Sequence, residues 1–208
     1  MHKLLICLIV AGVIGSAPAQ AGVYEEILDA ASNGKTGEVI GLLRKGLDVN
    51  TTDRDGTSLL AIAARTGNLE LLGFLLDNHG SLERSNRYGD TPLLLAVSQN
   101  HGEVVRRLVK AGANINPAGW TPLHYAIYGN RLDLAQFLVE HGAKLDLRAP
   151  NGRTALMLAT QQAQLDTVRW LVSSGADLSA KDYEGKSALD IAREKGQTEI
   201  VIFLQARQ

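Results

Sequence analysis

The chain has almost no cysteine. Its single one, Cys7, lies in an apolar segment near the N-terminus. One thiol cannot close a disulfide within the chain, and cysteine-based zinc sites need several thiolates. The remainder of the chain must therefore be held together by its apolar core.

An excess of positive charge is also lacking. The 208 residues carry 21 Lys and Arg against 22 Asp and Glu, a formal net charge of −1. Binding to nucleic acid is driven by concentrated positive charge, so we expect no nucleic-acid partner.

The only long apolar run is short by membrane standards. It extends from Leu4 to Gly15, after Lys3 and before a stretch of small residues. A spanning helix needs about 20 apolar residues, so the pattern favours a secretory signal peptide over an uncleaved anchor. Cleavage after Ala19 is one possibility, and cleavage after Ala21 is the one we favour. We expect residues 1–21 to be removed and the rest to be periplasmic or secreted, without membrane insertion.

What the chain does contain is one short motif repeated five times. The copies start at Ser58, Thr91, Thr121, Thr154 and Ser187, at intervals of 33, 30, 33 and 33 residues. A fixed period of this length is the signature of a stacked-repeat architecture, in which each unit buries its apolar face against its neighbours.

Each repeat predicts two helices. In Thr91-Pro92 and Thr121-Pro122, the hydroxyl caps a helix whose first position suits proline. The first helices should end at residues that tolerate left-handed backbone angles, except that alanine fills this position once, at a cost of about 1–2 kcal/mol. These positions are Gly34, Gly67, Asn100, Asn130, Ala163 and Gly196. The second helices carry apolar residues at i, i+3 and i+4, and their recurrent aromatic position predicts a shared core: Phe74, Phe137, Trp170 and Phe203.

Residues 121–126, Thr-Pro-Leu-His-Tyr-Ala, carry the complete motif of the ankyrin repeat. On this motif and its period, the chain resembles the ankyrin repeat family, and in particular small exported bacterial ankyrin repeat proteins. The resemblance implies a mainly α solenoid of about six stacked helix–turn–helix units with β-hairpin loops, and a structural hydrogen-bonding role for His124. We expect one ankyrin domain over 22–208, with units at approximately 22–55, 56–88, 89–118, 119–151, 152–184 and 185–208.

One loop departs from the repeat. Five residues separate Asn50 from Gly56 and Asp146 from Gly152, whereas Pro117 and Ala118 alone separate Asn116 from Gly119. The hairpin near the middle of the array should therefore be blunt. This is either neutral variation in a surface loop or a notch that admits a bulky element of a partner.

Catalytic and metal-binding patterns do not emerge from the sequence. After cleavage, His79 and His141 would lie two repeats apart, about 16–20 Å, which is too far for one metal. His101 is expected to be a surface cap of a second helix, and Asp53 to shape a turn. There is no phosphate-binding loop, zinc spacing or nucleophile elbow. We expect no enzyme activity, no cofactor and no metal.

A recognition surface remains. By the resemblance, partners bind across the concave side, and tyrosine, tryptophan and arginine dominate interface hot spots. Trp120, beside the short loop, is the foremost candidate; the alternative is a structural role in which its ring covers that loop. The candidate partner-binding residues are Arg87, Tyr88, Asp90, Trp120, Tyr128, Arg148, Arg153 and Tyr183.

The function expected from this surface is a monomeric, non-catalytic scaffold that binds another protein. Two more specific alternatives are an inhibitor or immunity protein that blocks a toxic enzyme, and an accessory protein in envelope oxidative stress. Small-molecule binding is disfavoured, because open concave stacks seldom provide a deep pocket.

Overall fold

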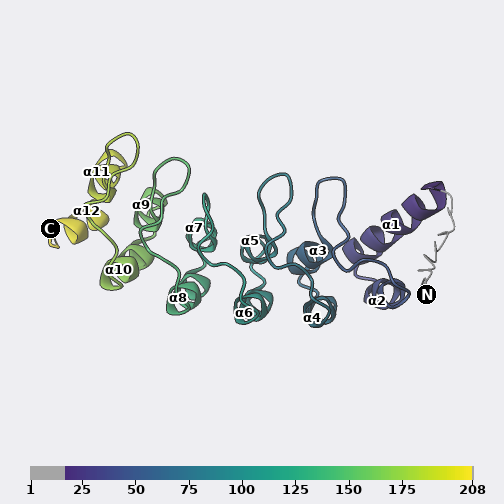
Figure 1. Cartoon of the computed structure of the whole chain (residues 1–208). Coiled ribbons are helices and arrows are strands. Elements are labelled where there is room, and N and C mark those ends of the chain that lie inside the picture. Colours follow the sequence, from purple (N-terminus) through teal and green to yellow (C-terminus); the bar gives the residue numbers. More distant parts are fainter. Residues whose placement is uncertain (1–16, 208) are drawn as a thin grey trace, which may run out of the picture.

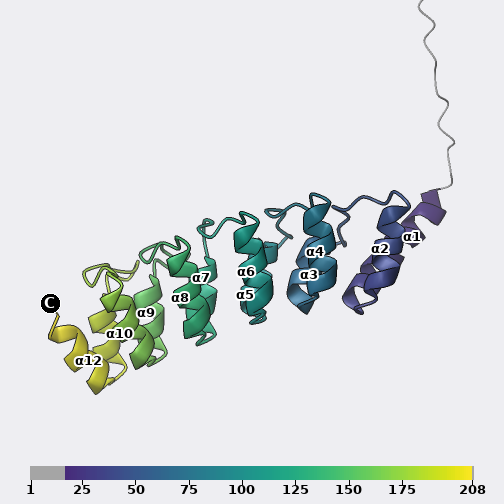
Figure 2. The same cartoon turned by 90° about the horizontal axis from the view of Figure 1, so that it is seen from below.

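Helix pairs stand side by side in one gently curved row (Figures 1 and 2). The computed structural model describes residues 17–207, and within that range it contains twelve α-helices and no strand. The helices are α1 (Ala17–Ser32), α2 (Thr36–Arg44), α3 (Leu59–Thr66), α4 (Leu69–Asp77), α5 (Pro92–Ser98), α6 (Gly102–Lys110), α7 (Pro122–Tyr128), α8 (Leu132–Glu140), α9 (Ala155–Gln161), α10 (Leu165–Ser173), α11 (Ala188–Glu194) and α12 (Thr198–Gln205). The predicted mainly α solenoid of helix–turn–helix units is confirmed.

The N-terminal segment lies largely outside this description. Of the predicted signal peptide, residues 1–16 are not among the described residues, and residues 17–21 belong to α1. Removal of residues 1–21 and the limits of the individual units stay predictions. No helix within residues 17–207 combines the length and apolarity needed to cross a membrane.

The repeated motif caps a first helix in four of its five copies, while Thr154 before α9 makes no side-chain capping bond. Thr91 Oγ1 accepts a hydrogen bond from the N–H of Leu94, and Thr121 Oγ1 accepts one from the N–H of His124. Pro92 and Pro122 then occupy the first turn, as predicted. The cap satisfies an N–H group that has no partner inside the helix, so the motif sets where each first helix begins.

The ends of the first helices follow the sequence, since all six predicted positions have positive φ, and one second helix ends differently from the others. Ala163 does adopt a left-handed conformation, with φ of 56°. At the end of α4, however, His79 takes this conformation with φ of 62°, although glycine does so at the equivalent positions. Gly80 serves close packing, because a Cβ there would lie 2.9 Å from the carbonyl oxygen of Leu75.

A single apolar core runs along the row, from Ile27 in α1 to Leu204 in α12. The recurrent aromatic residues are half-buried, and Phe137, Trp170 and Phe203 pack against this core, in agreement with the predicted shared core. Arginine side chains from the preceding repeat lie over three of these rings. The pairs are Arg44 over Phe74 at 5.9 Å, Arg106 over Phe137 at 4.9 Å and Arg169 over Phe203 at 6.0 Å.

Side chains that directly precede α4, α6, α8 and α10 each bond to the preceding repeat. Asn68 Nδ2 donates to Thr36 Oγ1 at 2.7 Å, and Gln164 Nε2 donates to the carbonyl of Ile127 at 2.9 Å. Arg131 donates to the carbonyl of Val97, and the Nε2 atom of His101 lies 3.0 Å from the carbonyl oxygen of Arg65. His101 therefore occupies the predicted cap position but bonds to the preceding repeat, with no capping bond to its own helix.

Candidate partner-binding surface

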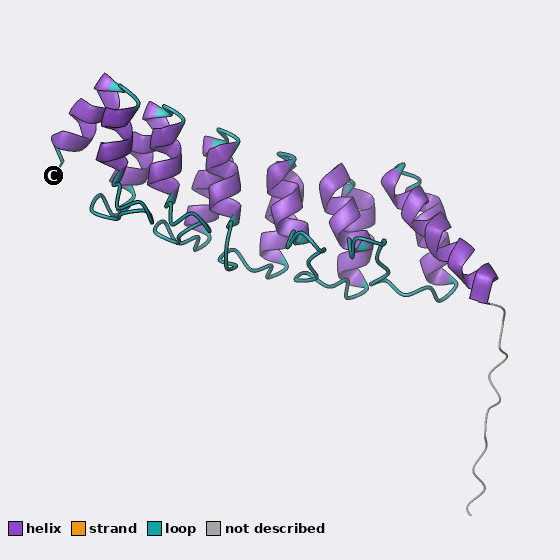
Figure 3. Cartoon of the chain, turned by 90° about the horizontal axis from the view of Figure 1, so that it is seen from above, coloured by secondary structure: helices purple, strands orange, loops and turns teal. Residues whose placement is uncertain are grey.

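The hairpin loops, here called fingers, and the first helices together form one surface, here called the finger face. The loops project beyond α3, α5, α9 and α11, away from the row of second helices, and gather along one edge of the stack (Figures 1 and 3). In each, an N–H group bonds to the carbonyl four residues on: Asp53 to Thr57, Asn86 to Asp90, Ala149 to Arg153 and Asp182 to Lys186. Within residues 17–207, one isolated β-bridge joins Thr52 and Ser58, and the N–H of Arg87 donates to the carbonyl of Asp55 in the preceding loop at 2.8 Å.

In three loops, the side chain at the first position accepts hydrogen bonds from backbone N–H groups of the same turn. Asp53 Oδ1 accepts hydrogen bonds from the N–H groups of Asp55 and Thr57, at 2.9 and 2.8 Å. Asn86 and Asp182 accept equivalent pairs of bonds in their own loops. The turn-shaping role predicted for Asp53 is confirmed. Backbone and side-chain bonds together hold the fingers in a defined shape.

The loop between α6 and α7 is different. Figure 1 shows it as a narrow loop above α7, between the wide loops above α5 and α9. Trp120 lies at its end and is half-buried, with its ring packed against the core. Its ring centroid lies 5.8 Å from that of His124, 5.5 Å from that of Tyr125 and 5.9 Å from that of Tyr128. The ring of Trp120 thus folds onto α7 beside the short loop and is only partly accessible, and its role in partner binding stays a prediction.

Three tyrosines of the finger face are strongly exposed. The exposed fraction is 65% for Tyr88, 63% for Tyr128 and 74% for Tyr183. Tyr88 carries the guanidinium of Arg87 over its ring at 4.8 Å. Arg87 in turn pairs with Asp55 of the preceding finger, with 3.0 Å between Nη1 and Oδ1.

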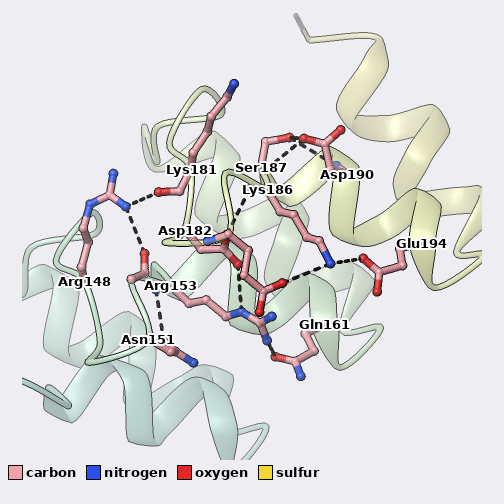
Figure 4. Close-up of polar contacts among 12 residues, drawn as sticks. Arg148, Asn151, Arg153, Gln161, Lys181, Asp182, Lys186, Ser187, Asp190 and Glu194 are labelled. Atoms are coloured by element: carbon pink, nitrogen blue, oxygen red, sulfur yellow. Dashed lines mark hydrogen bonds and ion pairs between the residues drawn. The ribbon is translucent and has the colours of Figure 1, made fainter.

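Two predicted arginines are engaged within the protein itself. The side chain of Arg153 is only 19% exposed, and its Nε lies 3.3 Å from Oδ2 of Asp182, which is 1% exposed (Figure 4). Arg148 is exposed, but it donates to the backbone carbonyls of Gly152 and Lys181. Arg153 is thus corrected from a free surface residue to one that joins two neighbouring fingers.

The last finger is tied further to α11. Lys186 Nζ lies 2.6 Å from a carboxylate oxygen of Glu194 and 3.2 Å from one of Glu184 (Figure 4). Burial alone raises the pKa of Asp182, but the N–H groups of Lys186 and Glu184 and the Arg153 guanidinium outweigh it, so the net pKa lies below its ordinary value. The C-terminal fingers are therefore braced by charge, whereas the middle of the face presents rings.

His124 is buried below Trp120. Its Nδ1 accepts a hydrogen bond from the backbone N–H of Thr121, which completes a capping box, and its Nε2 lies 3.1 Å from the carbonyl oxygen of Leu147 in the next loop. Burial lowers its pKa to about 4, so the ring is neutral at pH 7. The structural role predicted for His124 is confirmed.

Sequence reasoning missed Tyr125. It lies beside Trp120, and burial together with the Asp90 carboxylate raises its pKa. The signal was present, because Tyr125 and Tyr128 are three residues apart and so share one side of α7. Within residues 17–207, no three His, Cys, Asp or Glu side chains converge as metal ligands.

Comparison with known proteins agrees with this geometry. The family model for ankyrin repeats, three copies at a time, matches residues 27–118, 81–149, 115–182 and 146–207. The chain belongs to the ankyrin repeat family. Ankyrin repeats are protein-interaction modules, typically without catalytic activity.

Individual ankyrin relatives cover parts of the chain. It is 28% identical to an ankyrin repeat protein of Rickettsia bellii over 52% of this chain and 33% of the relative. It is 37% identical to an ankyrin repeat protein of fowlpox virus over 51% of this chain and 33% of the relative. It is 35% identical to a transient receptor potential cation channel homologue of Caenorhabditis elegans over 61% of this chain and 11% of the relative. The chain thus spans a third or less of these curated ankyrin relatives.

A solved structure matches over almost its whole length. The ankyrin chain is similar to a chain in the structure of a predatory endopeptidase from Bdellovibrio bacteriovorus in complex with an immunity protein. The TM-score is 0.79 at 30% identity, and the match covers 88% of this chain and 97% of that chain.

Proposed function

We propose that this ankyrin protein is exported to the periplasm, where it binds one protein partner on the finger face as a monomer and without catalysis. The observation that carries the proposal is that Tyr128 packs against Trp120 beside the blunt loop, with Tyr88 exposed on the finger of the preceding repeat. Tyr88 and Tyr128 are each more than 60% exposed on a surface whose loops are fixed by internal hydrogen bonds.

Exposed tyrosines at this place favour recognition over packing. Tyr128 lies at the end of α7 with Trp120 behind it, so it presents a rigid apolar surface with a hydroxyl. Such residues supply large contact areas at little cost in side-chain entropy, and they anchor the centres of interfaces. The blunt loop leaves room in front of them, between the fingers at 86–90 and 149–153.

A more specific candidate is inhibition of an endopeptidase. It is favoured by the similarity to the Bdellovibrio complex, which pairs an immunity protein with an endopeptidase and matches this chain at nearly full length. A braced set of fingers suits an inhibitor, since a surface that is already ordered loses little entropy on binding.

The test of the proposal is affinity capture from the exported fraction of the native cell, followed by mass spectrometry. We expect Tyr88→Ala combined with Tyr128→Ala to reduce capture of the partner at least tenfold. Ile202→Ala is the matched control, because Ile202 is 62% exposed but lies on α12, a second helix. Trp120 is less suitable for this test, since it also packs on the core.

One further measurement tests export, and a second separates an inhibitor from a plain scaffold. N-terminal sequencing of the periplasmic protein should give a chain that begins at Gly22. An endopeptidase inhibitor should abolish peptidase activity of the captured partner at a one-to-one ratio, whereas a plain scaffold should leave it unchanged. Undiminished capture by the double tyrosine variant would contradict the proposal itself.

A further inference from the structure

We infer that the partner inserts a positively charged side chain, an arginine or lysine of an exposed loop, between Asp90 and the ring cluster of Trp120, Tyr125 and Tyr128. This inference rests on the proposed function and deepens it. It specifies the chemistry that the middle of the finger face recognises, and it follows from three observations.

The first is the geometry of the rings. Trp120 and Tyr128 meet at 88° with centroids 5.9 Å apart, and Trp120 and Tyr125 meet at 55° with centroids 5.5 Å apart. Rings inclined in this way offer electron-rich faces in more than one direction. A cation within about 6 Å of such a face is attracted to it, most strongly by tryptophan.

The second is that this cluster lacks a cation of its own. Elsewhere in the described part of the chain, an arginine lies over each of four aromatic rings: Phe74, Tyr88, Phe137 and Phe203. Among residues 17–207, no arginine or lysine lies over Trp120, Tyr125 or Tyr128. Four rings are thus paired with guanidinium groups, whereas the cluster of Trp120, Tyr125 and Tyr128 has no such partner; Trp170 and Tyr183 also lack one, but they belong to no ring cluster within residues 17–207.

The third is the charge beside the cluster. Asp90 makes no ion pair within residues 17–207; its Oδ2 accepts one bond, from Nδ2 of Asn86 at 3.3 Å. Asp55 pairs with Arg87, Asp182 with Arg153 and Glu184 with Lys186, while Asp53 accepts two backbone hydrogen bonds within its own loop. Within residues 17–207, the Asp90 carboxylate is engaged neither by an ion pair nor by a backbone N–H group.

The spacing between Asp90 and Trp120 suits one cationic group. Each directly precedes a Thr-Pro cap, Asp90 before α5 and Trp120 before α7, so they occupy equivalent positions in neighbouring repeats. Packed helices lie about 8–10 Å apart. A planar guanidinium between them can bond the carboxylate with its edge and lie against a ring with its face.

A peptide titration followed by NMR of the full-length chain tests the inference. The probe is the peptide Gly-Gly-Arg-Gly-Gly, and the control replaces arginine by citrulline, which has nearly the same shape without the charge. We expect a saturable shift of the Trp120 indole N–H at millimolar peptide, at least tenfold weaker binding of the citrulline peptide, and no shift of the Trp170 indole. Asp90→Asn should weaken the arginine response at least fivefold, while retaining an oxygen that can accept the bond from Asn86.

Equal binding of both peptides, an unchanged response of Asp90→Asn, or no shift of Trp120 at 50 mM peptide would each overturn the inference. Failure of the inference remains distinct from failure of the proposed function. If capture of the partner depends on Tyr88 and Tyr128 but Asp90→Asn captures it normally, the inferred recognition of a cationic side chain is wrong, and the proposed protein partner is retained. If the arginine peptide binds but the tyrosine variants capture the partner normally, the preference for a cation is retained, and the proposed interface is wrong.

Discussion

The imidazole of His101 occupies the space that a side chain at Gly67 would need. A Cβ at Gly67 would lie 2.7 Å from the ring atoms Cε1 and Nδ1, well inside van der Waals contact. The same ring bonds to the carbonyl of Arg65 at the end of α3. The last turn of α3 is therefore closed by a residue of the following repeat.

Gly67→Ala should destabilise the protein for two separate reasons. The backbone at Gly67 has φ of 73°, which costs an alanine about 1–2 kcal/mol, and the new methyl group must displace His101, at a further cost of about 1–3 kcal/mol. The measurement is the free energy of unfolding in urea.

Gly34→Ala is the matched control for this variant. Gly34 has the same φ of 73°, but nothing lies within 4 Å of its Cβ position. It should show the backbone cost alone, and His101→Ala should rescue only the steric part of Gly67→Ala. Equal losses in the two glycine variants would exclude the clash.

Ala163→Gly should stabilise the protein by about 1 kcal/mol. Ala163 has φ of 56° after α9, where its Cβ is unfavourable, and glycine removes that cost. Ala159→Gly is the control, because Ala159 is buried within α9. Glycine at this helical position should destabilise the protein by about 1 kcal/mol or more. Thermal unfolding measures the stability of both variants. A loss of stability in Ala163→Gly would show that the packing of the methyl group outweighs the backbone strain.

Asp182→Asn should cost about 2–3 kcal/mol of unfolding free energy, because it removes the charge from hydrogen bonds to Lys186, Glu184 and Arg153. Since the folded-state pKa of Asp182 is lowered, its contribution is present above the unfolded pKa and is lost as pH falls through the folded one. The difference between wild type and variant, measured by urea unfolding, should therefore shrink below about pH 4. Arg153→Gln should have a smaller effect of the same sign, and a pH-independent difference would contradict this account.

His124 should make stability pH-dependent in a higher window. Its pKa is about 4 in the folded state against an ordinary value of 6.5, so protonation favours the unfolded chain. Its contribution is complete above pH 6.5 and declines as pH falls toward 4, by about 3 kcal/mol in total. Urea unfolding between pH 7 and 4.5 should show this slope in wild type and a flatter one in His124→Gln. Equal slopes would mean that His124 titrates normally in the folded state.

Much of the fold was predictable from local rules. The Thr-Pro pairs at 91 and 121 mark helix starts, and the left-handed position of Ala163 follows from its place in the repeat, because caps and backbone angles depend on a few neighbouring residues. The candidate site was less predictable. Trp120 folding onto α7 and Arg153 reaching Asp182 depend on side-chain directions across repeats, about which the repeat pattern carries no information.

The bonds from second helices to preceding repeats make neighbouring repeats depend on one another in one direction along the chain. Their donors follow their acceptors by 32 to 37 residues, at Asn68, His101, Arg131 and Gln164. The start of α2 and the last turns of α3, α5 and α7 therefore gain these partners only when the following repeat is in place. Loss of one repeat from the C-terminal side thus also removes a hydrogen bond from the repeat before it.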